Sequence, residues 1–216
     1  MTIVDIKDLS YGILDHFEMN IEKNQWTMIS GSNSSGKTTL VKLLGQLIST
    51  KEKITYHFDL SSPVAIGMVL EKNHIVGKTV EQELNYRLTF WSDPEKGSKA
   101  RLNQLLNLCD LASIATKNCD QLSLLERKKL EIAAAIALRP QLLLLDNPCG
   151  YLTKQEKKEI LAILKKIQTK EDCSIVMTTN DLEDTLFGDY VYILDRGKVV
   201  LEGKPLLDAA AADDAD

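Results

Sequence analysis

The chain of 216 residues lacks several features that would point to particular classes of protein. It has no apolar run approaching the roughly 18 residues of a membrane-spanning helix, so we expect none. Residues 1–5 show no basic region followed by an apolar one, so we expect no signal peptide. There is no excess of positive charge either, since 26 basic against 31 acidic residues give a formal charge of −5. That balance argues against nucleic acid as a partner.

Cysteine is scarce as well. Cys109, Cys119, Cys149 and Cys173 stand singly, without the C-x-x-C spacing of zinc or redox sites. This distribution favours reduced thiols in a cytosolic protein. The length nevertheless allows a sizeable core and predicts one domain.

One stretch carries a strong pattern, the G-x-x-x-x-G-K-[ST] spacing of a phosphate-binding loop. Its residues are Gly31, Ser32, Asn33, Ser34, Ser35, Gly36, Lys37, Thr38 and Thr39. The two glycines let backbone N–H groups approach phosphate oxygens, Lys37 can reach the β- and γ-phosphates, and the Thr38 hydroxyl can bind Mg²⁺. The strand-like run 26–29 before the loop and the helical spacing after it disfavour the alternative, a chance glycine- and serine-rich turn.

A second candidate site residue is the carboxylate Asp146, which follows the apolar run Leu142–Leu145. A fully apolar strand is typical of a parallel sheet covered on both faces, and ligands bind at the carboxyl ends of such strands. We therefore expect Asp146 to hold Mg²⁺ through water, opposite Thr38, rather than serve as a solvating strand end. Tyr11 could stack on an adenine ring or pack at a strand end, and the residues leave both open.

The remaining pattern predicts an α/β fold. We expect strands at 2–10, 17–21, 26–29, 64–70, 142–145 and 174–177 and a hairpin of 191–194 with 199–201. Helices are expected at 36–49, from Val80, over much of 95–109, from 122 to 138, and at 154–168, with a helical turn at 181–186. We interpret 1–208 as one domain with a helical subdomain at about 71–139. The tail 209–216 is of low complexity.

The order of these motifs resembles that of the ATP-binding subunits of ABC transporters over nearly the whole chain. Residues 69–81, with their Ile-Val-Gly-x-Thr-Val-Glu run, resemble the energy-coupling-factor branch, which serves vitamin and transition-metal uptake. The resemblance implies a P-loop NTPase of ABC type, with a mostly parallel central sheet, antiparallel β elements and an inserted helical subdomain. It also implies ATP and Mg²⁺ as cofactors and head-to-tail pairing with a second ABC ATPase. A transmembrane coupling subunit would dock near 72–77 and hold the chain at the cytoplasmic side of the cell membrane.

Several positions depart from the family's pattern. The signature Leu-Ser-Gly-Gly-Gln is replaced here by Leu122, Ser123, Leu124, Leu125 and Glu126. The two leucines place side chains where the family's glycines let a phosphate approach. We expect Glu126 to bring a negative charge near that phosphate.

The residues that hydrolyse or sense the γ-phosphate have changed too. By resemblance, Asn147 replaces the catalytic glutamate, Glu71 the Q-loop glutamine, Asn180 the switch histidine and Thr153 the D-loop aspartate. An amide cannot accept a proton from the attacking water. We therefore expect an ATPase subunit that binds Mg-ATP, hydrolyses it weakly and pairs with an intact ATPase. The alternative is a nucleotide-gated regulatory or interaction protein that does not power transport. A P-loop kinase is disfavoured by the motif order.

Overall fold

The computed structural model describes residues 1–51, 54–60, 65–70, 75–90 and 98–205. The chain begins with β1 (Thr2–Tyr11), which pairs antiparallel with β2 (Leu14–Glu22) and β4 (Ile54–Tyr56) in a three-stranded sheet. Strand β4 was not predicted, because it is short and lies in polar sequence. Its β-branched and aromatic residues are the one signal for it.

A six-stranded sheet forms the centre of the molecule in the order β5-β6-β7-β3-β8-β9. Its strands are β3 (Trp26–Gly31), β5 (Ile66–Val69), β6 (Leu142–Leu145), β7 (Ser174–Thr179), β8 (Tyr190–Asp195) and β9 (Lys198–Gly203). All neighbours pair in parallel except β8 and β9, which form the predicted antiparallel hairpin. The prediction of a mostly parallel central sheet is confirmed.

Both faces of this sheet are covered, which explains its apolar strands. In β6, Leu142 and Leu144 pack in a cluster with α1 (Lys37–Leu44) and the three-stranded sheet. Leu143 and Leu145 belong to a second cluster formed with the helices on the opposite face. Successive side chains of a strand point to opposite faces, so an unbroken apolar run is needed where both faces are buried.

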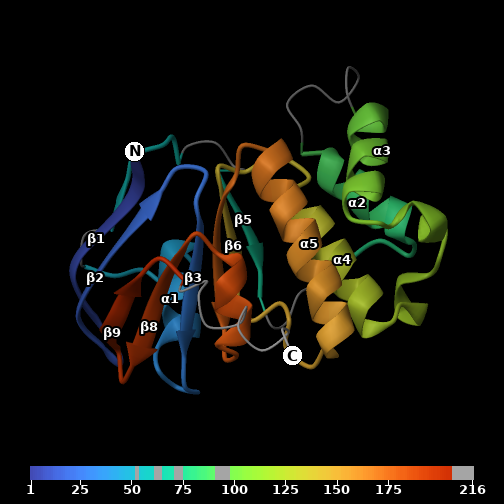
Figure 1. Ribbon diagram of the computed structural model, residues 1–216. Coiled ribbons are helices and arrows are strands. Elements are labelled where there is room, and N and C mark those ends of the chain that lie inside the picture. Colours follow the sequence, from blue (N-terminus) through green and yellow to red (C-terminus); the bar gives the residue numbers. More distant parts are fainter. Residues whose placement is uncertain (52–53, 61–64, 71–74, 91–97, 206–216) are drawn as a thin grey trace, which may run out of the picture.

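The other helices gather on one side of the molecule (Figure 1). They are α2 (Val80–Leu88), α3 (Ser98–Leu108), α4 (Leu124–Ala135) and α5 (Lys154–Lys170), with short 3₁₀ turns at Ala112–Ile114, Cys119–Gln121 and Glu183–Phe187. Figure 1 shows α5 between the strands and α2 to α4. The predicted start of a helix at Val80 is confirmed, because the Gln82 N–H donates to Thr79 Oγ1 at 3.3 Å.

Two helix ends were predicted too late. Helix α1 ends at Leu44 rather than 49, because Gln46 takes a left-handed φ of 57°. The N–H groups of Gln46 and Leu47 then close the helix end by donating to Leu43 O at 3.0 Å and Lys42 O at 2.9 Å. Helix α4 ends at Ala135 rather than 138, with Ile136 as its cap. Of the predicted segments, 64, 71–74, 95–97 and the tail 209–216 lie outside the described residues.

The carboxyl end of α4 is anchored to the sheet and to α5. A Cβ atom on Gly67 of β5 would lie 2.4 Å from the Ala135 carbonyl oxygen, so the helix approaches the strand as closely as backbones allow. Arg101 of α3 donates to the carbonyl of Ile136 at 2.6 Å and pairs with Glu171 at 2.8 Å. Its side chain is 3% exposed and that of Glu171 is 2% exposed. These contacts determine where α4 lies.

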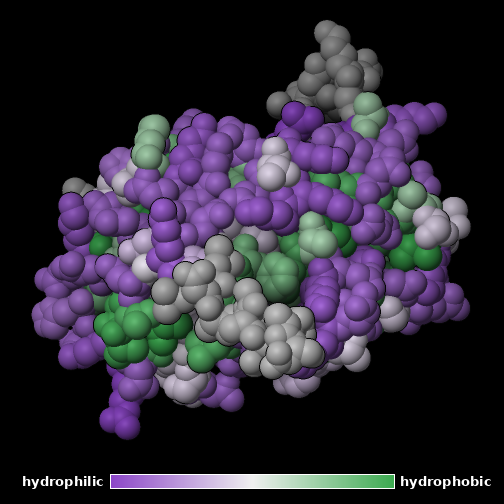
Figure 2. All heavy atoms as spheres, in the orientation of Figure 1, coloured by the Kyte–Doolittle hydropathy of each residue, from purple (hydrophilic) through white to green (hydrophobic). Residues whose placement is uncertain are grey.

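The surface in Figure 2 is mostly hydrophilic, with an apolar patch over β9, the strand that carries the exposed Val200 and Leu201. Among the described residues, no helix is both long and apolar enough to span a bilayer.

Candidate functional site

Most of the predicted nucleotide-binding residues lie at the carboxyl ends of central strands of the six-stranded sheet. Strands β6, β7 and β3 are neighbours and parallel, so their carboxyl ends meet there. The phosphate loop follows β3, Asp146 follows β6, and Asn180 follows β7. Ligands bind at such an edge in parallel α/β sheets.

The phosphate loop is packed so closely that its glycines are required. A Cβ on Gly31 would lie 2.2 Å from the carbonyl oxygen of Leu194, in the adjacent strand β8. Gly36 has a φ of 110°, in the region that favours glycine, and directly precedes α1. The Gly197 N–H donates to Ser35 O at 3.0 Å, which ties the loop to the β8–β9 turn. These close contacts restrict the phosphate loop to one backbone conformation.

The Lys37 ammonium lies over this loop. It donates to the carbonyls of Gly31 and Ser32, both at 2.8 Å, and to Ser35 Oγ at 3.4 Å. Burial lowers the pKa of Lys37, while the negative charge of Asp146 acts in the opposite direction. A buried cation surrounded by neutral oxygens is favourable for binding an anion.

A cavity of about 770 Å³ opens at this edge. Its lining consists of loop residues, strand-end residues and two residues of α4: Ile13, Asn33, Ser34, Gly36, Lys37, Thr38, Thr39, Leu124, Lys128, Asp146, Asn147, Gly150, Tyr151 and Asn180. Gly31 and Ser32 line an adjoining hollow of about 510 Å³. Tyr11 lies at the end of β1 and is in neither set, whereas Ile13 lies in the first.

Asp146 is oriented by a residue that the sequence analysis missed. The Thr178 hydroxyl of β7 donates to Asp146 Oδ1 at 2.8 Å and accepts from the Asn147 N–H at 2.9 Å. The sequence offered a weak signal for it, the Thr-Thr pair at the end of β7. Because Thr38 and Asp146 line the same cavity and supply oxygen donors, these residues fit a Mg²⁺ ion.

The two asparagines expected to replace catalytic residues both line the cavity. Asn147 has a φ of 49°, a left-handed conformation that asparagine tolerates better than most residues. Its side-chain amide lies over Gly150, where an added Cβ would come within 2.7 Å of Nδ2. Glu71 lies outside the described residues.

Thr153 begins α5 as its N-cap. The Glu156 N–H donates to Thr153 Oγ1 at 3.3 Å, and the Thr153 N–H donates to Glu156 Oε2 at 2.8 Å. This reciprocal pair is a capping box. The residue at the D-loop position thus has a clear structural role.

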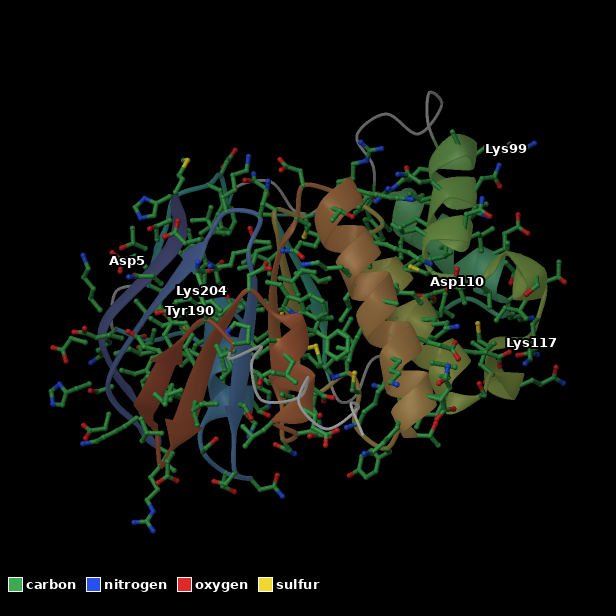
Figure 3. The ribbon with its side chains drawn as sticks, viewed as in Figure 1. Asp5, Lys99, Asp110, Lys117, Tyr190 and Lys204 are labelled. Atoms are coloured by element: carbon green, nitrogen blue, oxygen red, sulfur yellow. The ribbon has the colours of Figure 1, made fainter. Side chains whose placement is uncertain are left out.

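The segment at the signature position is also a capping box, at the start of α4. Ser123 Oγ accepts from the Glu126 N–H, and the Glu126 carboxylate accepts from the Ser123 N–H at 2.7 Å. Glu126 also pairs with Lys117 at 2.7 Å, on the helical side of the molecule (Figure 3). Within this chain the Glu126 carboxylate is paired with Lys117 and held by the cap. The expectation that Glu126 brings a negative charge near a phosphate concerns the paired subunits and stays a prediction.

The three leucines of that segment differ in how far their side chains are buried. Leu122 and Leu125 pack partly buried against the core, whereas Leu124 is 42% exposed and lines the cavity of its own chain. Lys128, one turn further along α4, lines it too. The sequence analysis missed Lys128, since a lysine in the charged run 126–129 carries no distinguishing signal. It also missed Tyr151, which is 90% exposed.

Comparison with known proteins agrees with this geometry. The family model described as ABC transporter matches residues 14–150. The energy-coupling factor transporter ATP-binding protein EcfA of Pediococcus pentosaceus is 30% identical over 223 residues, spanning 94% of this chain and 79% of that protein. EcfA1 of Streptococcus agalactiae is 28% identical over 89% of this chain and 72% of its own length.

Solved structures share the fold. CbiO1 from Clostridium perfringens, part of the ABC transporter complex cbiONQ, superposes with a TM-score of 0.87 at 24% identity, covering 94% of this chain and 89% of that one. The bacterial ABC transporter cassette MJ0796, solved as a dimer, gives a TM-score of 0.79, also at 24% identity, with coverage of 94% and 98%. Together with the family match and the EcfA relatives, the closely packed phosphate loop and the strand-end carboxylate identify the chain as a member of the ABC transporter ATP-binding family, in its energy-coupling-factor branch.

Proposed function

We propose that this chain is the nucleotide-binding subunit of an energy-coupling-factor importer that holds Mg-ATP but hydrolyses it slowly by itself. The observation that carries the proposal is one cavity, lined by the phosphate loop, Thr38 and Asp146 together with asparagines at 147 and 180. Binding groups and altered hydrolytic positions thus share one site. The domain would span 1–208, with 71–139 as its helical part.

Binding follows from the chain's own residues. The loop supplies backbone N–H groups and the Lys37 ammonium to the phosphates, at the amino-terminal end of α1. Thr38 and Asp146 would hold Mg²⁺, which supplies charge neutralisation to the phosphates when bound. Thr178 keeps the Asp146 carboxylate oriented. Ile13 supplies an apolar surface at the cavity wall, and Tyr11 remains a candidate for contact with the base.

Slow hydrolysis follows from Asn147. Its amide cannot take the proton of an attacking water, and loss of a general base costs about 10²–10⁴ in rate. The amide at Asn180 and the altered position 71 reduce the remaining contacts to the terminal phosphate. ATP would therefore act in this subunit mainly by being bound, closing a dimer with a second ABC ATPase that carries its own glutamate.

A membrane subunit would dock beside Ile75–Gly77. There the Glu83 carboxylate, 1% exposed, accepts from the N–H groups of Val76 at 2.7 Å and Gly77 at 2.8 Å. This buried carboxylate holds the segment rigidly while the Val76 side chain stays exposed. A rigid segment with an exposed apolar residue suits docking, and it would keep the chain on the cytoplasmic side of the membrane.

Thermal melting tests the binding half of the proposal. Mg-ATP at about 100 times its dissociation constant should stabilise the chain by roughly 2.7 kcal/mol. Lys37→Ala should abolish the shift, because it removes the charge that faces the phosphates, whereas Lys42→Ala, on the same helix but outside the cavity lining, should retain it. Absence of any shift with millimolar Mg-ATP would refute nucleotide binding.

Reconstitution with an intact ABC ATPase and a membrane subunit tests the pairing. Turnover should depend on the partner's glutamate and be insensitive to Asn147→Ala. Lys37→Ala should lower it in part, by weakening dimer closure. Unchanged activity after removal of the partner's glutamate would contradict the proposal. Recovery of homodimers alone, with no ATPase or membrane subunit, would favour the regulatory alternative.

A further inference from the structure

Helix α4 brings a second lysine to the cavity that contains the phosphate loop. Lys37 and Lys128 line this cavity together with Asp146, and these are the charged side chains of its described lining. Two cations against one carboxylate leave the site with a net positive charge. Such a site attracts a polyphosphate more strongly than one lysine would.

The packing of α4 holds Lys128 in this place. Arg101 and Gly67 anchor the carboxyl end of the helix, as described above. The neighbouring Lys129 pairs instead with Glu159 of α5, at 2.8 Å. Lys128 is therefore carried on a rigid element and not on a loop, so it needs no rearrangement of the chain to reach the cavity.

The partners of Lys128 leave its charge available. Among the described residues its one ion-pair partner is Glu131, at 3.1 Å. That carboxylate also pairs with Arg127 at 3.3 Å, so one negative charge is shared by two positive ones. The side chain of Lys128 is 10% exposed. A partly buried cation that shares its counter-ion gains from binding an anion.

The segment after β6 contributes further residues to the lining of the cavity. Asn147, Gly150 and Tyr151 line the cavity alongside Lys128. Burial raises the pKa of the Cys149 thiol in this segment to about 12, while the charges of Lys157 and Lys128 act in the opposite direction. Lys128 and the altered base position, Asn147, thus belong to the lining of one cavity.

We propose that Lys128 binds the terminal phosphate of the nucleotide held by Lys37 of the same chain, and so lets the single subunit distinguish a nucleoside triphosphate from a diphosphate. This inference rests on the proposed nucleotide-binding function. It differs from sharing of a site between two subunits, because both lysines come from one chain. Lys128 thereby supplies in cis a phosphate contact to a site whose Asn147 and Asn180 are neutral.

Calorimetric titration tests this at chain concentrations where light scattering reports a monomer. The probes are Mg-ADP and the Mg complex of the non-hydrolysable β,γ-imido analogue of ATP. Lys128→Met should weaken the binding of the triphosphate analogue by about 10- to 100-fold, the contribution of one charge-assisted hydrogen bond. The affinity for Mg-ADP should change by less than about threefold. Lys128→Arg, which keeps the charge, should retain most of the affinity.

Lys129→Met is the matched control. It removes the same charge from the next residue, whose partner is Glu159 and which does not line the cavity. It should change the two affinities equally and slightly. If Lys128→Met leaves the preference for the triphosphate intact, or if Lys129→Met reduces it as much, the inference is wrong. Thermal melts of each variant establish that the compared chains are folded.

Mixing two variants separates action within one chain from action between chains. Lys37→Ala keeps Lys128, and Lys128→Met keeps Lys37. The mixture should bind the triphosphate analogue no better than Lys128→Met alone, because no chain has both lysines. Recovered affinity would overturn action in cis. Failure of the unchanged chain to bind either nucleotide would overturn the proposed function itself, an outcome distinct from a loss of triphosphate preference alone.

Discussion

The phosphate loop and the amino-terminal end of α4 line the same cavity, yet they are built differently. The loop is held by backbone contacts: Gly31 lies against the Leu194 carbonyl, and Lys37 bonds to loop carbonyls. The start of α4 is held by side chains, the capping box of Ser123 and Glu126 with its ion pair to Lys117. Backbone contacts at close range restrict residue type, whereas a cap can be made by several residues.

This difference explains how the chain departs from its family's pattern without local structural defects. Three of the altered positions serve the fold: Glu126 and Thr153 belong to capping boxes, and Asn147 adopts a left-handed conformation suited to asparagine. The loop, which needs its glycines and lysine, keeps the pattern. This contrast is consistent with the proposed function, in which the site binds nucleotide and lacks a general base.

The largest expected effect comes from breaking the anchor of α4. Arg101→Met would leave the buried Glu171 without its ion-pair partner, with the neutral Gln104 amide as the remaining donor to its carboxylate among the described residues. It would also remove the guanidinium bonds to the Ile136 and Ala137 carbonyls. The free energy of unfolding should fall by about 3–5 kcal/mol, measured by urea denaturation. Lys154→Met, which breaks an exposed 3.7 Å pair with Glu183, should cost less than about 0.5 kcal/mol. Equal losses for both variants would contradict the importance of the buried anchor.

The second effect comes from the loop. Gly31→Ala would force its new Cβ to within 2.2 Å of Leu194 O, so β3 or β8 must shift. We expect a loss of about 1–3 kcal/mol in stability, together with loss of the thermal shift given by Mg-ATP. Gly12→Ala meets open space at a φ of 61° and should cost about 1 kcal/mol while keeping the shift. A normal shift in Gly31→Ala would show that the loop is less constrained than the start of α4.

A smaller effect is expected from the cap. Glu126→Gln can still accept from the Ser123 N–H but loses the charge paired with Lys117. Denaturation at pH 7 should show that the free energy of unfolding falls by about 1 kcal/mol, and this difference should become smaller in high salt. A loss unaffected by salt would mean that the ion pair contributes little.

The Glu126→Gln substitution should also change how the stability of the chain depends on pH. The hydrogen bonds from Lys117 and from the Ser123 N–H lower the pKa of Glu126 below its usual value. The stabilisation is thus fully present above the unfolded pKa, near 4.3, and is lost as the pH falls through the lower folded pKa. The difference in stability between the unchanged chain and the Glu126→Gln variant should therefore narrow as the pH falls below about 4. A constant difference down to about pH 2 would contradict this assignment.

The smallest effect concerns turnover. Asn147→Glu restores a carboxylate beside Asp146, but the amide at Asn180 and the altered residue at 71 remain. Phosphate release by the isolated chain should rise by much less than the about 10²–10⁴ that a general base contributes in a complete site. The left-handed backbone at 147 should cost the glutamate up to about 1 kcal/mol in stability. Ordinary turnover by this variant, or by the unchanged chain, would contradict the account of the altered site.

The sequence by itself determined the elements whose signals are local. The loop spacing, the apolar run of β6, the cap at Thr79 and the glycine of the β8–β9 turn each lie within a few residues, and the structure has all of them. The family resemblance, drawn from the order of those motifs, is confirmed by the match over 14–150. Strand and helix centres were predictable for the same reason, whereas the ends of α1 and α4 and the short β4 were not.

Tertiary structure decided the contacts that join distant segments. Thr178 reaches Asp146 across 32 positions of sequence, and Arg101 meets Glu171 across 70. Lys128 becomes part of the site because α4 packs beside the sheet edge, and no local pattern distinguishes it from Lys129. Periodicity and capping report what a segment does with its neighbours in sequence. The charged side chains that line a cavity depend on how the strands pair and how the helices pack on them. This arrangement is fixed by the burial of both faces of the sheet.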